Sequence, residues 1–211
     1  DAIGYPLMIK AAHGGGGKPA AAPAPAAKAD PAEGSLIAVP GSVASGCPAS
    51  KSTAVHPNGR YIYRATDAGS FGNLCAFSFD AVAKTLTPVP GSPFRAGIGT
   101  LSVAIDPAGS FVYAANLDDG TVSAFGIDGA TGSLAAVAGS PFMAGTSPIS
   151  VVVESSGRYV YVANNSPGAA SGTISGFAIN RATGALTPLP GSPYVAPRAP
   201  WALAADPRGK F

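Results

Sequence analysis

Charged residues are scarce in this chain of 211 residues. Asp, Glu, Lys and Arg make up 11% of the sequence, against roughly 25% in an average soluble protein. The net charge of +2 is too small to predict a nucleic-acid partner or an anionic membrane surface. No apolar run reaches the roughly 18 residues of a membrane-spanning helix. We therefore expect a globular protein with no nucleic-acid partner and no membrane span.

Cysteine and histidine are also rare. The two cysteines, Cys47 and Cys75, have no cluster of histidines with which to form a zinc site. A disulfide between them would suit an exported protein. However, Cys47 is predicted in a loop and Cys75 near the start of a strand, which does not establish bridging geometry. We interpret them as two independent, half-buried residues.

A secretory signal is missing as well. The chain begins with Asp1 rather than Met and has no basic segment followed by an apolar one. The sequence is nevertheless poor in Lys and Glu and rich in Ser, Thr, Ala and Gly, a composition that suits an exported protein. We expect a periplasmic, extracellular or cell-surface location, with the natural N-terminus missing from this sequence.

What is abundant is glycine and proline, with 28 and 21 residues, and both fall between runs rich in Val, Ile, Phe and Tyr. Two sequence markers repeat together. The first marker is Gly41-Ser42, Gly91-Ser92, Gly139-Ser140 and Gly191-Ser192, with spacings of 50, 48 and 52 residues. The second is a turn that starts at His56, Asp106, Glu154 and Asp206. Two markers with one period indicate a repeat protein of short strands and tight turns.

The clearest copy of the repeat predicts four strands, at 102–106, 111–116, 121–128 and 134–138. The connections between them are short, so the strands must form an antiparallel meander. Four such strands in about 50 residues make a blade of an all-β propeller. A sandwich does not need one unit copied in fixed order, and a β-helix would have a much shorter period.

The ends of the repeat region predict an incomplete propeller over residues 35–211. Residues 35–42 match 185–192, the outermost strand of a blade, and predict a strand that closes the last blade of a ring. Residues 201–206 predict the inner strand of a further blade. We expect about three complete blades with partial ends, a fragment that stays an open half-ring or self-associates through its exposed blade faces. Residues 19–34, rich in Ala and Pro, predict a semi-extended linker.

The motifs at 131–142, 103–112 and 161–164 resemble the repeat of the seven-bladed lactonase-like propellers, of the 6-phosphogluconolactonase and YVTN types. Seven blades would need about 350 residues. The resemblance implies hydrolysis of a sugar-type lactone, although no catalytic set or cofactor site can be assembled from the residues present. The alternative is an exported or surface propeller that binds a ligand or protein partner without catalysis.

By the same resemblance, ligands bind on the face formed by two sets of loops, those from outer to next inner strand and those from second to third strand. The side chains expected there are Lys51, Arg95, Arg198, Asn116, Asp118, Asp119, Asn164 and Asn165. The arginines would bind a phosphate or carboxylate, and the Asn and Asp side chains a sugar or cation. Alternatively, the Asn and Asp residues only form turns and the arginines only keep the surface soluble.

The turn residues His56, Asp106, Glu154 and Asp206 are equivalent in the repeat, which favours a turn-capping role for all four. His56 could otherwise serve as a general base, but it has no visible acid partner and lies on the opposite face. No Gly-x-Ser-x-Gly nucleophile motif and no metal-spaced histidine cluster occurs.

Residues 3–18 are similar to the glycine-rich loop of biotin carboxylases, in the ATP-grasp superfamily. By resemblance Lys10 would contact a nucleotide and Gly14, Gly15, Gly16 and Gly17 would approach its phosphates. The similarity breaks at Pro19, and the metal-binding carboxylates and scaffold of that family are absent. We interpret 1–18 as a fusion or an accidental junction, with ATP binding as a remote alternative.

Overall fold

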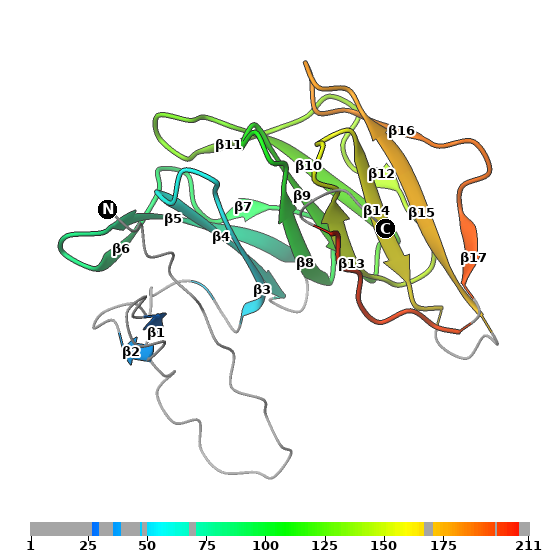
Figure 1. Cartoon of the computed structure of the whole chain (residues 1–211), viewed down its shortest axis with the longest axis horizontal. Coiled ribbons are helices and arrows are strands. Elements are labelled where there is room, and N and C mark those ends of the chain that lie inside the picture. Colours follow the sequence, from blue (N-terminus) through cyan, green and yellow to red (C-terminus); the bar gives the residue numbers. More distant parts are fainter. Residues whose placement is uncertain are drawn as a thin grey trace, which may run out of the picture.

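The computed structural model describes residues 27–29, 36–38, 47, 50–67, 71–166, 171–196 and 198–206. In these ranges the regular structure is entirely β, with three antiparallel sheets side by side (Figure 1). No helix capable of crossing a membrane occurs in them. The sheets are called blades 1, 2 and 3.

In each blade the first four strands form a meander of consecutive neighbours, and a short fifth strand pairs with the third. Blade 1 consists of β3 (Ser50–Val55), β4 (Tyr61–Asp67), β5 (Gly72–Asp80), β6 (Thr85–Pro88) and β7 (Phe94–Arg95). Blade 2 consists of β8 (Thr100–Ile105), β9 (Phe111–Asn116), β10 (Thr121–Ile127), β11 (Leu134–Ala136) and β12 (Phe142–Met143). Blade 3 consists of β13 (Pro148–Val153), β14 (Tyr159–Asn164), β15 (Gly172–Ile179), β16 (Leu186–Pro188) and β17 (Tyr194–Ala196). The inner strands β3, β8 and β13 contact one another in series. The predicted propeller blade is confirmed.

The fourth strand of each blade is split by the Gly-Ser marker. In blade 2, β11 and β12 both pair with β10 and are the two halves of one outer strand. Gly139 turns the chain between them with φ of 85°, and Ser140 Oγ accepts a hydrogen bond of 2.9 Å from Ala124 N of β10. The serine thus satisfies a backbone donor that the interrupted strand leaves open. Ser92 and Ser192 do the same in blades 1 and 3, at 2.9 and 3.0 Å.

The second marker caps the turn between the first two strands. The Asp106 carboxylate accepts hydrogen bonds from Phe111 N at 2.6 Å and Ala108 N at 3.2 Å. His56 uses both ring nitrogens: Nδ1 accepts from Asn58 N at 3.2 Å, and Nε2 donates to Gly109 O of the next blade at 2.8 Å. A carbonyl can only accept, so this geometry fixes the tautomer. Such a ring is a structural bridge between two turns.

The hydrophobic core lies between blades rather than within one. One buried cluster joins blades 1 and 2, and a second joins blades 2 and 3. Two buried tyrosines cross these interfaces: Tyr63 donates to Gly132 O at 2.9 Å, and Tyr113 donates to Gly184 O at 3.1 Å. Blades 1 and 2 therefore each contribute a tyrosine to the outer turn of the blade that follows.

Serines of the inner strands make a second series of inter-blade hydrogen bonds. Ser52 Oγ accepts from Val103 N at 3.3 Å, and Ser102 Oγ accepts from Val151 N at 3.1 Å. Ser150 Oγ accepts from Leu203 N in the same way, at 3.1 Å. Residues 201–206 thus occupy the place of a fourth inner strand, but the prediction of a strand there is wrong. No described strand pairs with them, and a strand needs such a partner to complete its hydrogen bonds.

The N-terminal part contains one further pair of strands, β1 (Ala27–Ala29) and β2 (Leu36–Ala38). β1 lies in the predicted linker and β2 in the predicted closing strand. Among the described residues β2 pairs with β1 and with no blade strand. Lys10 and Gly14–Gly17, with the rest of residues 1–18, lie outside the described residues.

Candidate functional site

The two sets of loops predicted to share one face do meet at blade 2. The connection from β7 to β8 packs against the turn from β9 to β10. Asp119 Oδ2 accepts a hydrogen bond from Ile98 N at 2.7 Å, and Asn116 Oδ1 accepts one from Gly97 N at 3.2 Å. This face is called the ligand-side face below.

Asn116 is fully buried in this contact. Its Nδ2 donates to Thr121 Oγ1 at 3.0 Å and to Ser123 Oγ at 2.9 Å. Its Oδ1 also accepts from Thr100 Oγ1 at 2.9 Å, in addition to the bond from Gly97 N. All the hydrogen-bonding capacity of the amide is used inside the blade, so its observed role is to hold the connection on the ligand-side face.

Asn164 occupies the same place in blade 3 and is also fully buried. Its Nδ2 donates to Thr173 Oγ1 at 3.0 Å and to Ser175 Oγ at 2.9 Å. Its Oδ1 has no partner among the described residues. Pro148 stands where blade 2 has Thr100 and offers no hydroxyl. The second donor of blade 2 is also missing, because Gly145 N donates to Gly120 O, whereas its equivalent Gly97 N donates to Asn116 Oδ1. The neighbouring Asn165 is buried too and donates to Pro200 O at 3.2 Å.

The charged members of the predicted set remain exposed. Lys51, Arg95, Asp118, Asp119 and Arg198 all lie at the surface. Arg95 stacks over the Phe71 ring, with its guanidinium carbon 4.0 Å from the ring centroid. A guanidinium over an aromatic face keeps its N–H edges free for an anion. Asp118 is exposed as well, whereas Asp119 already accepts the hydrogen bond from Ile98 N.

Two surface grooves lie on the opposite face, between the turns that join first to second strands and those that join third to fourth strands. One of about 450 Å³ includes Arg60, Asp80 and Thr131 in its lining. The other, of about 270 Å³, includes Ser110 and Arg181. They gather no acid–base pair around a common point and lie away from the predicted ligand residues.

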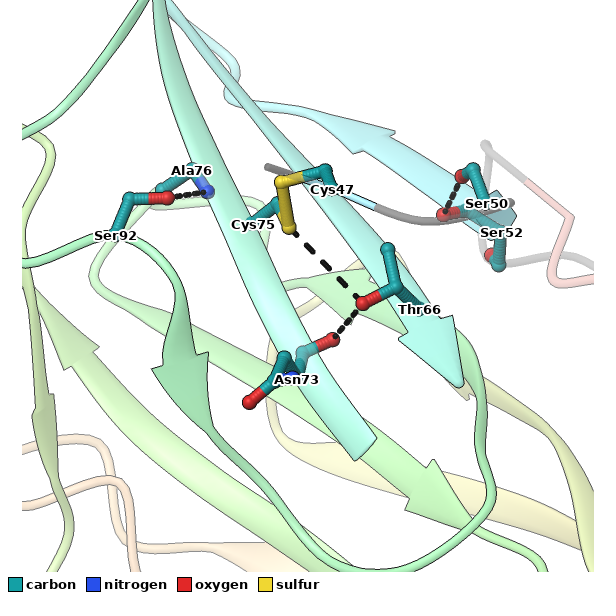
Figure 2. Close-up of a disulfide and its surroundings, with 8 residues drawn as sticks. All are labelled: Cys47, Ser50, Ser52, Thr66, Asn73, Cys75, Ala76 and Ser92. Atoms are coloured by element: carbon teal, nitrogen blue, oxygen red, sulfur yellow. Dashed lines mark hydrogen bonds between the residues drawn. A yellow bond between two sulfur atoms is a disulfide. The ribbon is translucent and has the colours of Figure 1, made fainter. Parts of the chain in front are cut away.

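The two cysteines form a disulfide, with their Cα atoms 6.3 Å apart (Figure 2). The prediction of two independent cysteines is therefore wrong. Counted along the repeat, Cys47 corresponds to Gly97 and Cys75 to Ser123, which blade 2 already places around one asparagine. The signal in the sequence is the repeat register, which assigns the two cysteines to positions that lie on either side of one side chain in blade 2.

No described group is arranged as a general base with a matching acid. Both nitrogens of His56 are engaged. Burial raises the pKa of the Tyr63 and Tyr113 hydroxyls well above the ordinary value, which leaves them as hydrogen-bond donors. No group of three or more His, Cys, Asp or Glu side chains in the described part of the chain could hold a metal ion.

These features define an all-β repeat protein of the propeller class. The family "Lactonase, 7-bladed beta-propeller" matches residues 26–134 and 53–203. The chain belongs to this family. No curated protein sequence matches it.

Solved structures with the same fold include two proposed 6-phosphogluconolactonases and a periplasmic gluconolactonase. The protein from Bacteroides fragilis NCTC 9343 is 22% identical, with 71% of this chain and 40% of that chain covered and a TM-score of 0.59. The protein from Bacteroides uniformis ATCC 8492 is 19% identical, with 87% and 55% covered and a TM-score of 0.67. The gluconolactonase from Pseudomonas aeruginosa is 18% identical, with 66% and 39% covered and a TM-score of 0.51. This chain thus spans 39% to 55% of these structures.

Proposed function

We propose that this chain forms part of a lactonase-type propeller and that this propeller binds a sugar-type lactone on the ligand-side face. We further propose that its own described residues contribute recognition rather than hydrolysis. The observation that carries this proposal is the pair of exposed side chains Arg95 and Asp118 on that face. Family membership supplies the class of ligand.

The two side chains suit the chemistry of an aldonolactone. A sugar lactone presents hydroxyl groups, and a carboxylate such as that of Asp118 can accept hydrogen bonds from them. A phosphorylated lactone also presents an anion, which an arginine binds through its planar fork of N–H groups. Ring opening needs in addition a positioned base or activated nucleophile, and His56, the described histidine, is committed to two turns.

A second candidate function is an exported propeller that binds a ligand or partner without any lactonase role. The Cys47–Cys75 disulfide favours export, because disulfides persist in oxidising compartments and are rare in the cytosol. Export is compatible with both candidate functions. Binding of a sugar lactone would distinguish the first candidate from the second.

Calorimetry with glucono-1,5-lactone and its 6-phosphate tests recognition, and a pH-stat assay with the same compounds tests hydrolysis. We expect binding that weakens at least tenfold in Arg95→Ala and Asp118→Ala, with hydrolysis at the uncatalysed rate. Arg181→Ala is the matched control, because Arg181 is equally exposed but lies on the opposite face.

Two results would contradict the proposal. Turnover above the uncatalysed rate that Arg95→Ala abolishes would show that the chain is itself a hydrolase. Absence of binding to either lactone would remove the recognition role and leave the second candidate.

A further inference from the structure

The disulfide occupies the position of a polar network that the other blades use. Cys47 corresponds to Gly97 and Gly145, and Cys75 corresponds to Ser123 and Ser175. Between them, Thr66 of β4 corresponds to Asn116 and Asn164. The register of the strands agrees, since Arg64 pairs with Cys75 as Ala114 pairs with Ser123.

In blades 2 and 3 this network holds the connection that enters the inner strand. Asn116 links Ser123 of β10 to Gly97 N of the connection before β8. In blade 3, Ser175 Oγ accepts a hydrogen bond from Asn164 Nδ2. The same hydroxyl donates to Ala144 O, in the connection before β13, at 2.6 Å. Both links are hydrogen bonds, which do not respond to thiol reagents.

Blade 1 lacks the groups for such a link. Thr66 Oγ1 donates to Asn73 O at 3.3 Å and lies 4.0 Å from Cys75 Sγ, so its polar contacts stay within β4 and β5 (Figure 2). Cys47 is instead joined to Cys75 by a covalent bond.

The two solutions compete for the same space. A Cβ atom placed on Gly97 would lie 2.6 Å from Asn116 Cγ, so one of the two side chains would have to shift. A residue smaller than asparagine on the facing strand relieves this contact, and Thr66 is smaller. The change from Gly, Asn and Ser to Cys, Thr and Cys is one coordinated replacement.

We propose that the Cys47–Cys75 disulfide is the redox-dependent fastening of the ligand-side connection into blade 1, in place of the asparagine network of blades 2 and 3. A dithiol such as dithiothreitol attacks one sulfur, and the other leaves as a thiolate. The reagent's second thiol then resolves the mixed disulfide. The protein gains two electrons and two protons, and the reagent becomes a cyclic disulfide.

The reduced chain retains no described hydrogen bond that could replace the fastening. Cys75 is fully buried and Cys47 is half-buried, so Cys47 Sγ is the accessible point of attack. Reduction therefore breaks the covalent link from Cys47 to β5, while the hydrogen-bonded links of Gly97 and Ala144 stay in place. This inference does not depend on the proposed lactone ligand.

Hydrogen exchange of the full chain, with and without dithiothreitol, tests the inference. We expect at least tenfold faster exchange in β3 on reduction, no change in β8 and β13, and recovery on reoxidation. The variant C47S/C75S should exchange as the reduced protein does. The variant C47G/T66N/C75S carries the residues of blade 2 at these three positions. Its β3 should exchange slowly, at the same rate with and without dithiothreitol.

Unchanged exchange in β3 on reduction would overturn the inference, and so would an equal increase in all three inner strands. The triple variant adds an independent criterion, because rapid exchange of its β3 would show that the asparagine network is not an equivalent fastening. If that variant does not fold, reduction and reoxidation of the natural chain still decide the outcome.

Discussion

Replacing Asn116 with alanine should destabilise the protein more than replacing Asn164, its equivalent in the repeat. Both side chains are fully buried, so truncation leaves a comparable cavity in each blade. The difference lies in the hydrogen bonds. Asn116 makes two through Nδ2 and two through Oδ1, whereas Asn164 makes two through Nδ2 and none through Oδ1.

The size of the effect follows from the count. A buried hydrogen bond contributes about 1 kcal/mol net to stability. We expect losses of about 4 kcal/mol for Asn116→Ala and about 2 kcal/mol for Asn164→Ala from this source. A difference of about 2 kcal/mol corresponds to roughly 4–8 °C in Tm for a chain of this size. Urea denaturation followed by circular dichroism resolves such a difference.

A third variant isolates the cause. Pro148→Thr supplies the hydroxyl that Thr100 provides in blade 2, and should contribute about 1 kcal/mol when Asn164 is present. In blade 2 the Thr100 hydroxyl also lies 2.9 Å from Gly97 O, so a threonine at position 148 keeps a backbone acceptor in the Asn164→Ala background. The double-mutant cycle therefore reports the part of the gain that depends on the Asn164 side chain. Equal costs for the two alanine variants, or no coupling in the cycle, would refute this account of the unpartnered oxygen.

Two further predictions concern an interface and a turn. Tyr113→Phe should cost about 1 kcal/mol in urea denaturation because its hydroxyl donates to Gly184 O, whereas Tyr161→Phe, with no described acceptor, should cost almost nothing; equal costs would argue against the inter-blade role. Burial raises the pKa of the Glu154 carboxyl, but hydrogen bonds from Ser156, Arg158 and Tyr159 outweigh it and hold the pKa below its ordinary value. This carboxylate therefore stabilises the fold at pH values above the pKa that it has in the unfolded chain. The contribution is lost as the pH falls through the pKa that it has in the folded protein. Urea midpoints from pH 6 to pH 3 should fall more steeply for the natural chain than for Glu154→Gln, and identical slopes would exclude this contribution.

The blade could be predicted because its signals are local. The second strand was predicted at 111–116, and β9 is Phe111–Asn116. Turn residues on each side fix such boundaries. The outer strand was less accurate, because a continuous strand was predicted at 134–138 whereas β11 ends at Ala136 and the strand resumes at Phe142. The serine that joins the two halves acts on a strand 16 residues away, which local pattern does not show.

The candidate site was harder to predict because burial depends on distant residues. Asn116 and Asp118 are both polar and only two positions apart, yet one is fully buried and the other is exposed. The connection around Gly97 makes the difference, since it covers the asparagine. The disulfide is hard to predict for a similar reason, because the two cysteines lie in separate segments and only the position of each in the repeat brings them together.

The interfaces between blades have a direction, and this bears on how such a chain evolves. Each interface takes a tyrosine from the earlier blade and a glycine turn from the later one. A duplicated or deleted repeat therefore leaves the remaining tyrosines facing glycines. Blade 1 is the exception, because Lys84, with φ of 56°, stands where blade 3 has Gly184. A Cβ at Gly184 would collide with the Phe111 ring. A repeat that follows blade 2 therefore needs a glycine at this position, which blade 3 has and blade 1 lacks.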